Sequence, residues 1–309
     1  MSVNSNVIHE TSPAIAASAV SPLRLFAWSI RKELWEHRAT YWALLAVGGL
    51  VTVGLIYSAF RLPGKIEYLA TLSTSERLAA YDLPYSAAAM ILMATMVLVA
   101  CFYCIETLYG ERRDRSILFW KSMPVSDPIA VLAKFAIPTI ALPTFALCMA
   151  IFSQLVMLIA STLMVYVNGL SVSALWALLP ISTMPIGLAY FVLAISLWFA
   201  PVYAWFMFVS AWAKRATLVW AVAPAIAVIA IEQLTLNTST LTQVIKSRVV
   251  GVASASFTAN SDSSGRDSRA DLVPDPGKFF ASPELWIGLL IAAALLIATI
   301  RMRRLRDPI

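Results

Sequence analysis

Few residues in this sequence could carry out catalysis. The two histidines, His9 and His37, both precede the first long apolar stretch, so we expect no serine–histidine pair and no histidine-bearing metal site within the apolar part of the chain. Gly64 and Lys65 lack the upstream glycine and the following serine or threonine of a phosphate-binding loop. All three cysteines fall inside apolar stretches, where buried free thiols are expected: Cys101, Cys104 and Cys148. The sequence therefore predicts no catalytic residue, metal or cofactor in this chain.

A run of charged and aromatic residues between two apolar stretches, residues 108–127, points instead to binding. Charged residues begin it, large apolar residues follow, and turn-forming residues end it. The charged group is Glu111, Arg112, Arg113, Asp114 and Arg115, and the apolar group is Ile117, Leu118, Phe119 and Trp120. Because four large apolar side chains are costly to expose to water, we expect them to be buried in a partner. A simple anchor on the membrane surface is the alternative.

This run resembles the type 2 superfamily of ATP-binding-cassette (ABC) permeases. Members commonly carry Glu-Arg-x-x-x-Ser-Ile-Leu-Phe-Trp-Lys-Ser-x-Pro-Val-Ser-Asp between their second and third spans. The sequence agrees at each specified position from Glu111 to Asp127, and Met123 stands where leucine is more usual. The resemblance implies a short coupling helix, roughly residues 116–123, that docks in a groove of a separate cytoplasmic ABC ATPase. The residues expected to bind it are Arg112, Arg115, Ser116, Ile117, Leu118, Phe119, Trp120, Lys121, Met123 and Pro124.

The same resemblance implies an exporter in a bacterial inner (plasma) membrane. It would contain two permease chains, either identical or siblings, and two ATPase subunits that bind ATP and magnesium. An apolar pathway would suit a lipophilic or amphipathic cargo such as a lipid, drug or peptide. One alternative is a membrane scaffold or sensor that recruits a cytoplasmic partner without transport. An intramembrane enzyme acting on lipid is a further alternative, but the chain offers no credible acid, base or nucleophile set.

Membrane-spanning helices must position this run. Of the 309 residues, 60% are hydrophobic and 13% are charged, whereas about 25% are charged in a soluble domain. Six apolar stretches are long enough to cross a hydrocarbon core about 30 Å thick, and they cover residues 41–60, 86–109, 129–167, 180–213, 216–235 and 285–300. The third exceeds one crossing, and we expect one long or tilted helix kinked at Pro138 and Pro143. The sequence thus predicts an all-α membrane protein with six transmembrane helices.

Basic residues near the ends of the apolar stretches predict the orientation. With a cytoplasmic N-terminus, clusters before the first stretch and after the second, fourth and sixth all lie inside. These clusters are Arg24, Arg31, Lys32 and Arg38; Arg112, Arg113, Arg115 and Lys121; Lys214 and Arg215; and Arg301, Arg303, Arg304 and Arg306. Both termini are then cytoplasmic. The net charge of +6 is mostly a topology signal, and no nucleic-acid binding is expected.

An amphipathic helix is predicted just before the first stretch. Ser21 and Pro22 are typical of a helix start, and apolar residues follow at helical spacing. Trp28, Arg31 and Trp35 combine aromatic rings with a cation, as expected at the level of lipid headgroups. We therefore expect a helix that lies on the membrane surface. A simple extension of the first span is the alternative.

The remaining chain divides into a tail, a permease domain and one large external segment. Residues 1–20 are expected to form a disordered tail before a permease domain of residues 21–309. The external segment, about residues 236–283, is rich in Ser, Asp, Gly and Pro in its middle and is predicted to be mobile there. A short helix near residues 241–252 is possible, and residues 261–275 are predicted to be dispensable for folding.

Three ionisable residues lie at the depth of the predicted spans, and one of them, Glu232, is near the external end of the fifth. Glu106 is near the inner end of the second span, and Lys134 is near the start of the third. Because an unpaired carboxylate at that depth is costly, we expect Glu106 to pair with the arginines at positions 112, 113 and 115 or with Lys134. Structural pairing is favoured over contact with a substrate.

Overall fold

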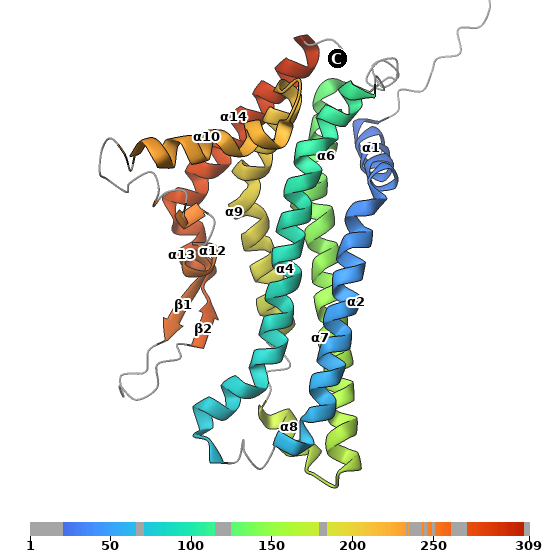
Figure 1. Cartoon of the computed structure of the whole chain (residues 1–309), viewed down its shortest axis with the longest axis vertical. Coiled ribbons are helices and arrows are strands. Elements are labelled where there is room, and N and C mark those ends of the chain that lie inside the picture. The colour runs from blue at the N-terminus through green and yellow to red at the C-terminus, as the bar shows by residue number, and fades with distance from the viewer. Residues whose placement is uncertain are drawn as a thin grey trace, which may run out of the picture.

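Long helices form a bundle in the computed structural model of the chain (Figure 1). The structure describes residues 21–65, 71–114, 125–178, 184–232, 234, 243, 246–248, 251–260 and 271–305. Within this part of the chain, five helices are long and apolar enough to cross a membrane, and they cover Arg38–Arg61, Ala80–Arg113, Asp127–Val167, Met184–Trp212 and Pro283–Leu305. The predicted multi-pass, helical membrane protein is therefore confirmed at this level.

The long helices alternate with shorter elements along the chain. The first half contains α1 (Pro22–Glu36), α2 (Arg38–Arg61), the 3-10 turn η1 (Pro63–Lys65), α4 (Thr74–Arg113), α6 (Asp127–Ala136), the π-helical turn η2 (Ile137–Ala141) and α7 (Leu142–Val167). The second half contains α8 (Val172–Leu178), α9 (Met184–Trp212), α10 (Thr217–Ile231), α12 (Val252–Ser256), α13 (Pro276–Ala281) and α14 (Pro283–Leu305). Strands β1 (Phe257–Asn260) and β2 (Asp271–Pro274) form an antiparallel pair.

Helix α1 covers the segment for which an amphipathic helix was predicted. The Ser21 hydroxyl accepts a hydrogen bond from the backbone N–H of Arg24, and Pro22 occupies the first turn. The helix ends at Glu36 with His37 as its C-cap, and α2 then continues in a different direction (Figure 1). Ile30 and Leu34 pack against the main core, and α1 packs against α6. The segment is therefore a separate helix and not an extension of the first span.

The long third stretch is one continuous helical passage, as predicted. It runs from Asp127 to Val167 and contains the π-helical turn at Ile137–Ala141. Pro138 lies in this turn, and Pro143 opens the first turn of α7. Proline lacks a backbone N–H and its ring crowds the preceding turn, so a local widening of the helix relieves the clash without ending the helix.

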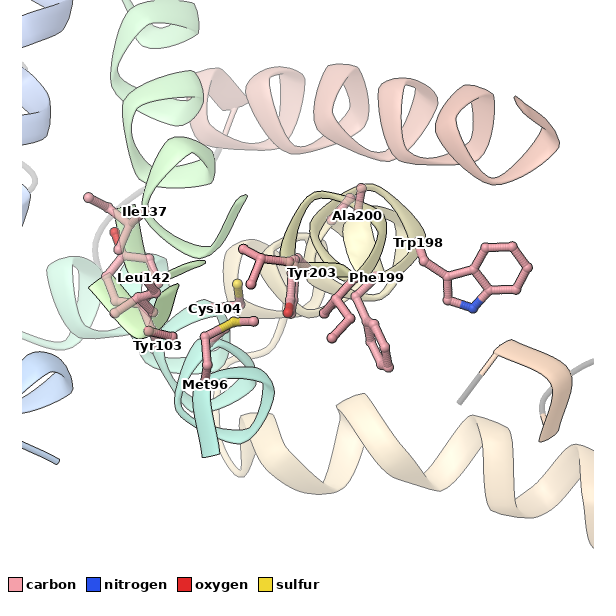
Figure 2. Packing of buried hydrophobic residues seen from close by; sticks show 14 of the residues in the cluster. Met96, Tyr103, Cys104, Ile137, Leu142, Trp198, Phe199, Ala200 and Tyr203 are labelled. Atoms are coloured by element: carbon pink, nitrogen blue, oxygen red, sulfur yellow. The ribbon is translucent and has the colours of Figure 1, made fainter. Parts of the chain in front are cut away.

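Helix α9 lies at the centre of the bundle and packs against α4, α7 and α14. Figure 2 shows Tyr203 of α9 near Cys104 and Met96 of α4, while Trp198 points to another side of α9. All four side chains are buried. Cys104 therefore meets the expectation of a buried thiol, but Cys148 is exposed on the surface of the chain, so that expectation was wrong for Cys148.

Among the described residues of the fifth predicted span, the structure has one short helix. Helix α10 has 15 residues and runs across the direction of the long helices (Figure 1). The ends of α4, α9 and α14 lie together, because Arg112 bonds to the carbonyl of Ala213 and Arg303 pairs with Glu111. Since α9 and α14 both end there, the chain between them must return toward the opposite end. A sixth crossing by this connection remains a prediction.

The described parts of the large external segment form regular elements that pack on α9. The Tyr190 hydroxyl donates hydrogen bonds to the carbonyls of Ser256 and Asp275, and the Trp198 indole N–H donates to the carbonyl of Arg248. Phe279 of α13 is fully buried in the main core. Residues 261–270, in the middle of the segment, where mobility was predicted, lie outside the described residues.

These contacts divide the stretch predicted to be dispensable into two parts. Replacing residues 261–270 with a flexible linker of equal length should leave expression and the thermal unfolding midpoint unchanged. The same replacement of residues 271–275 should lower the midpoint, because it removes β2 and the Asp275 carboxylate that caps α13, a cap contributing about 1 kcal/mol. Thermal unfolding of the two detergent-purified variants distinguishes these outcomes. An equal fall in the unfolding midpoint of both variants would mean that residues 261–270 also contribute to the packing.

Candidate functional site

The run that predicted partner binding connects the end of α4 to the start of α6. Glu111 and Arg112 belong to the last turn of α4, and Asp127 begins α6. The predicted binding residues Arg115, Ser116, Ile117, Leu118, Phe119, Trp120, Lys121, Met123 and Pro124 lie outside the described residues. The structure therefore describes the two ends of the run, and these ends enter a buried cluster of charges.

Lys134 of α6 is the centre of this cluster. Its side chain is only 1% exposed, and its ammonium nitrogen lies 2.9 Å from both carboxylate oxygens of Glu33 on α1. The same nitrogen lies 3.0 Å from Glu111 Oε1 and donates to the hydroxyl of Thr107 at 3.1 Å, both on α4. One lysine thus joins helix α1 to the helices on either side of the run.

Arg303, near the end of α14, joins the two ends of the run directly. Its Nη2 lies 3.4 Å from Glu111 Oε2, and its Nε lies 3.3 Å from Asp127 Oδ1. The Arg303 side chain is 6% exposed, so water screens these charges weakly. The more exposed Arg304 approaches Asp127 at 3.7 Å. We call Glu33, Glu111, Asp127, Lys134 and Arg303 the ion network.

The charges of the ion network nearly balance. Three carboxylates face two cations, and Lys32 approaches Glu111 Oε1 at 3.6 Å from the partly exposed edge. Burying ions is costly, and attraction between partners compensates only when the geometry is good. Such a network therefore contributes more to a specific arrangement of α1, α4, α6 and α14 than to net stability.

The electrostatics of Glu33 follow from this arrangement. Burial alone would raise the pKa of its carboxyl, but the nearby Lys134 and Lys32 charges outweigh burial and lower the pKa to about 2. The Tyr103 hydroxyl donates a hydrogen bond to Glu33 Oε2 at 3.1 Å. Burial lowers the pKa of the neighbouring His37, partly opposed by Glu33. Glu33 is thus held as a carboxylate at neutral pH.

This lowered pKa predicts how the role of Glu33 depends on pH. A carboxylate whose pKa falls on folding stabilises the protein above its unfolded pKa, and this contribution disappears as pH falls through the folded pKa. Glu33→Gln should therefore lower the thermal unfolding midpoint at pH 7, and the difference from the unmodified chain should shrink between pH 4.5 and about 2. A difference that stays constant over this range would contradict the assignment. The measurement is thermal unfolding of both proteins across that pH series.

Arg112 occupies a position that the sequence did not predict. Arg112 is 4% exposed, and its guanidinium donates hydrogen bonds to the carbonyls of Ser210, in the last turn of α9, and Ala213, just after that helix. The Ser210 hydroxyl in turn accepts from the backbone N–H groups of Leu108 and Tyr109. Through these hydrogen bonds, Arg112 holds α4 against the turn that follows α9. A direct contact between this guanidinium and a partner remains untested.

Glu106, a second charged residue predicted at span depth, has a peripheral position. Glu106 Oε1 lies 3.2 Å from Arg113 Nη1, and both side chains are about half exposed. This agrees with the predicted pairing to the arginine group. Glu106 and Lys134 thus differ in their surroundings, because Lys134 is enclosed by Glu33 and Glu111.

The outer face of α1 carries the residues predicted to lie at headgroup level. Trp28 and Trp35 are 71% and 73% exposed, and with Arg31, Lys32 and Glu36 they line a shallow groove. The opposite face carries Glu33 into the ion network. This two-sidedness fits a helix between a headgroup layer and a protein core, although its position relative to lipid remains a prediction.

A metal ion does not suit the one group of possible ligands found among the described residues. Ligand atoms of Glu33, Glu36 and His37 lie within 4.8 Å of one another. Lys134 already lies against both carboxylate oxygens of Glu33, and Lys32 lies 3.1 Å from Glu36. These cations occupy the positions that a metal ion would need.

Glu33, Glu111, Asp127 and Arg303 were not predicted as an interacting group. A signal existed for Glu33, because it lies between Ile30 and Leu34 on the apolar side of α1, where a solvent-facing acid is unexpected. Comparison of the chain with protein-family models, curated proteins and solved structures gave no match. The functional argument therefore depends on the run and on the geometry at its ends.

Proposed function

We propose that this chain is the membrane-spanning permease subunit of an ATP-driven ABC exporter whose ATPase is a separate polypeptide. The observation that carries the proposal is the run from Glu111 to Asp127, with its apolar residues between charged and turn-forming ends. Residues 116–123 would form a coupling helix that inserts Phe119 and Trp120 into a groove of the ATPase. Aromatic side chains at the centre of an interface commonly provide most of its binding energy.

The ion network supports this proposal because it gives the run a rigid connection to the helices. A pull on residues 115–124 acts first on α4 and α6, which hold Glu111 and Asp127. Through Lys134 the displacement reaches Glu33 on α1, and through Arg303 it reaches α14. Buried charge networks resist gradual deformation, so movement of an attached ATPase would shift these helices together.

The remaining parts of the proposal concern topology and assembly. Six crossings would place both termini in the cytoplasm of a bacterial inner membrane, with the connection from α9 to α14 supplying the sixth. A second permease copy, identical or a sibling, would complete the pathway, and ATP and magnesium would bind to two ATPase subunits. Because the surfaces of the long helices are apolar, a lipophilic or amphipathic cargo suits such a pathway.

Co-expression with the ABC ATPase encoded nearest to this chain tests the proposal. The ATPase should co-purify with the tagged chain from detergent-solubilised membranes, and its ATP turnover should change when the chain is present. An ATPase that neither binds the chain nor changes its turnover would contradict the proposal for that pair. A matched control uses an unrelated ABC ATPase expressed at the same level.

A membrane scaffold or sensor is the alternative function. The same run and the same ion network would serve a protein that holds a cytoplasmic partner and moves no cargo. This alternative predicts a bound partner without ATP-dependent movement of any lipophilic probe across reconstituted vesicles. Transport of such a probe that requires ATP and both subunits would exclude it.

A further inference from the structure

We infer that Arg303 is a positioning residue that fixes the two ends of segment 115–124 relative to each other. One guanidinium lies between Glu111, close to the end of α4, and Asp127, at the start of α6. The segment departs from the first of these helices and returns to the second. Arg303 belongs to neither helix, so the C-terminal helix α14 acts as a clamp at the base of the segment.

The chemistry of arginine suits this role. A guanidinium spreads its charge over three nitrogens, so Nη2 and Nε lie at ion-pair distance from two different carboxylates at once, although Nε makes no hydrogen bond to a described residue. The Arg303 side chain and Glu111 are nearly inaccessible to water, and Asp127 is 24% exposed. Without the Arg303 charge, Glu111 would keep Lys134 and Asp127 would keep the more exposed Arg304, but no cation among the described residues would approach both carboxylates, which favours separation of the two helix ends.

The neighbouring arginines on α14 show why the role falls to Arg303. Arg304 is 60% exposed and, within the described part of the chain, pairs with Asp127 alone, at 3.7 Å. Arg301 is exposed on the same helix. Arg303 is therefore placed to hold both ends, and Arg301 provides a matched arginine for a control.

A functional consequence follows, and this part rests on the proposed permease function. With Arg303→Met, the aromatic residues of the segment are unchanged, so the ATPase should still bind. The base of the segment would be loose, so ATPase movement would transmit poorly to the helices. ATP turnover should then lose its dependence on the permease chain while co-purification persists.

Limited trypsin digestion tests the structural part without any ATPase. The full chain is reconstituted in lipid nanodiscs, and cleavage after Arg115 and Lys121 is compared with cleavage after Lys214, which lies in the exposed turn after α9. Arg303→Met should accelerate cleavage after Arg115 and Lys121 by about fivefold or more, the change expected when local opening becomes easier by about 1 kcal/mol. Cleavage after Lys214 should stay unchanged. Arg301→Met should leave both rates unchanged.

Two outcomes would overturn the inference. Unchanged cleavage within the segment would show that Arg303 does not hold it, and equal acceleration after Lys214 would show general loosening of the fold. If Arg303→Met yields no folded protein, Asp127→Asn is assayed instead under the same criteria. If digestion shows that Arg303 does not hold the segment, binding of the ATPase is still tested by co-purification. If the ATPase does not bind, the digestion result still decides the role of Arg303.

Discussion

Lys134→Met is expected to destabilise the chain more than any other single substitution in the ion network. The ammonium nitrogen lies 2.9 to 3.1 Å from four oxygen atoms, which belong to Glu33, Glu111 and Thr107. Methionine retains the volume of the side chain but leaves two buried carboxylates without this cation. Removing one partner of a buried ion pair costs about 3–5 kcal/mol. Denaturant titration of the purified chain in mixed micelles measures the loss.

Two control variants separate this effect from a general response to the loss of a lysine. Lys65→Met removes an exposed lysine after α2 and should change the free energy of unfolding by less than about 0.5 kcal/mol. The double variant Lys134→Met with Glu33→Gln should lose less than the sum of its two single variants, because each removes the partner of the other. Equal effects at Lys134 and Lys65 would contradict the central position of Lys134.

The sequence was sufficient to locate most of the long helices, because a membrane core demands long apolar stretches. The predicted stretch 129–167 coincides with the continuous passage Asp127–Val167, and the proline pair marked its irregular turn. The existence of helix α1 was also predictable, since its serine cap, proline and apolar spacing are local signals. Hydropathy did not predict that the fifth stretch would appear as a short transverse helix, because hydropathy reports no direction.

The ion network was harder to predict for a physical reason. Lys134 was recognised as unusual, but its partner Glu33 lies 101 positions away in the chain. Pairing of distant charges depends on how the helices pack, and no local pattern specifies that packing. Arg303 was interpreted only as part of a positive cluster that sets orientation. Its contacts with Glu111 and Asp127 form only when the end of α14 packs beside α4 and α6, and the sequence does not specify that packing.

The second large effect is expected from replacing both aromatic residues of the proposed coupling helix. Phe119→Ala with Trp120→Ala should leave membrane insertion and the unfolding midpoint near those of the unmodified chain, since the ion network is retained. Each ring is expected to contribute ~2 kcal/mol or more to ATPase binding. Together they would weaken the complex by about a thousandfold, because each 1.4 kcal/mol corresponds to about tenfold in affinity.

The chain offers a matched control with two other aromatic residues. Trp28→Ala with Trp35→Ala removes two exposed rings from α1, at the same end of the bundle. If these rings contact lipid headgroups, this variant should bind the ATPase normally. If the run is only a membrane anchor, both double variants should retain the ATPase.

The amount of ATPase that co-purifies with each molecule of the chain tests the central claim most directly. It is measured for the unmodified chain and for the two double variants, with ATP-dependent transport of a lipophilic probe recorded from the same preparations. The account predicts that Phe119→Ala with Trp120→Ala loses both the ATPase and transport, while Trp28→Ala with Trp35→Ala keeps the ATPase. Full retention of ATPase and transport after replacement of Phe119 and Trp120 would contradict the proposal that this run couples a permease to its ATPase.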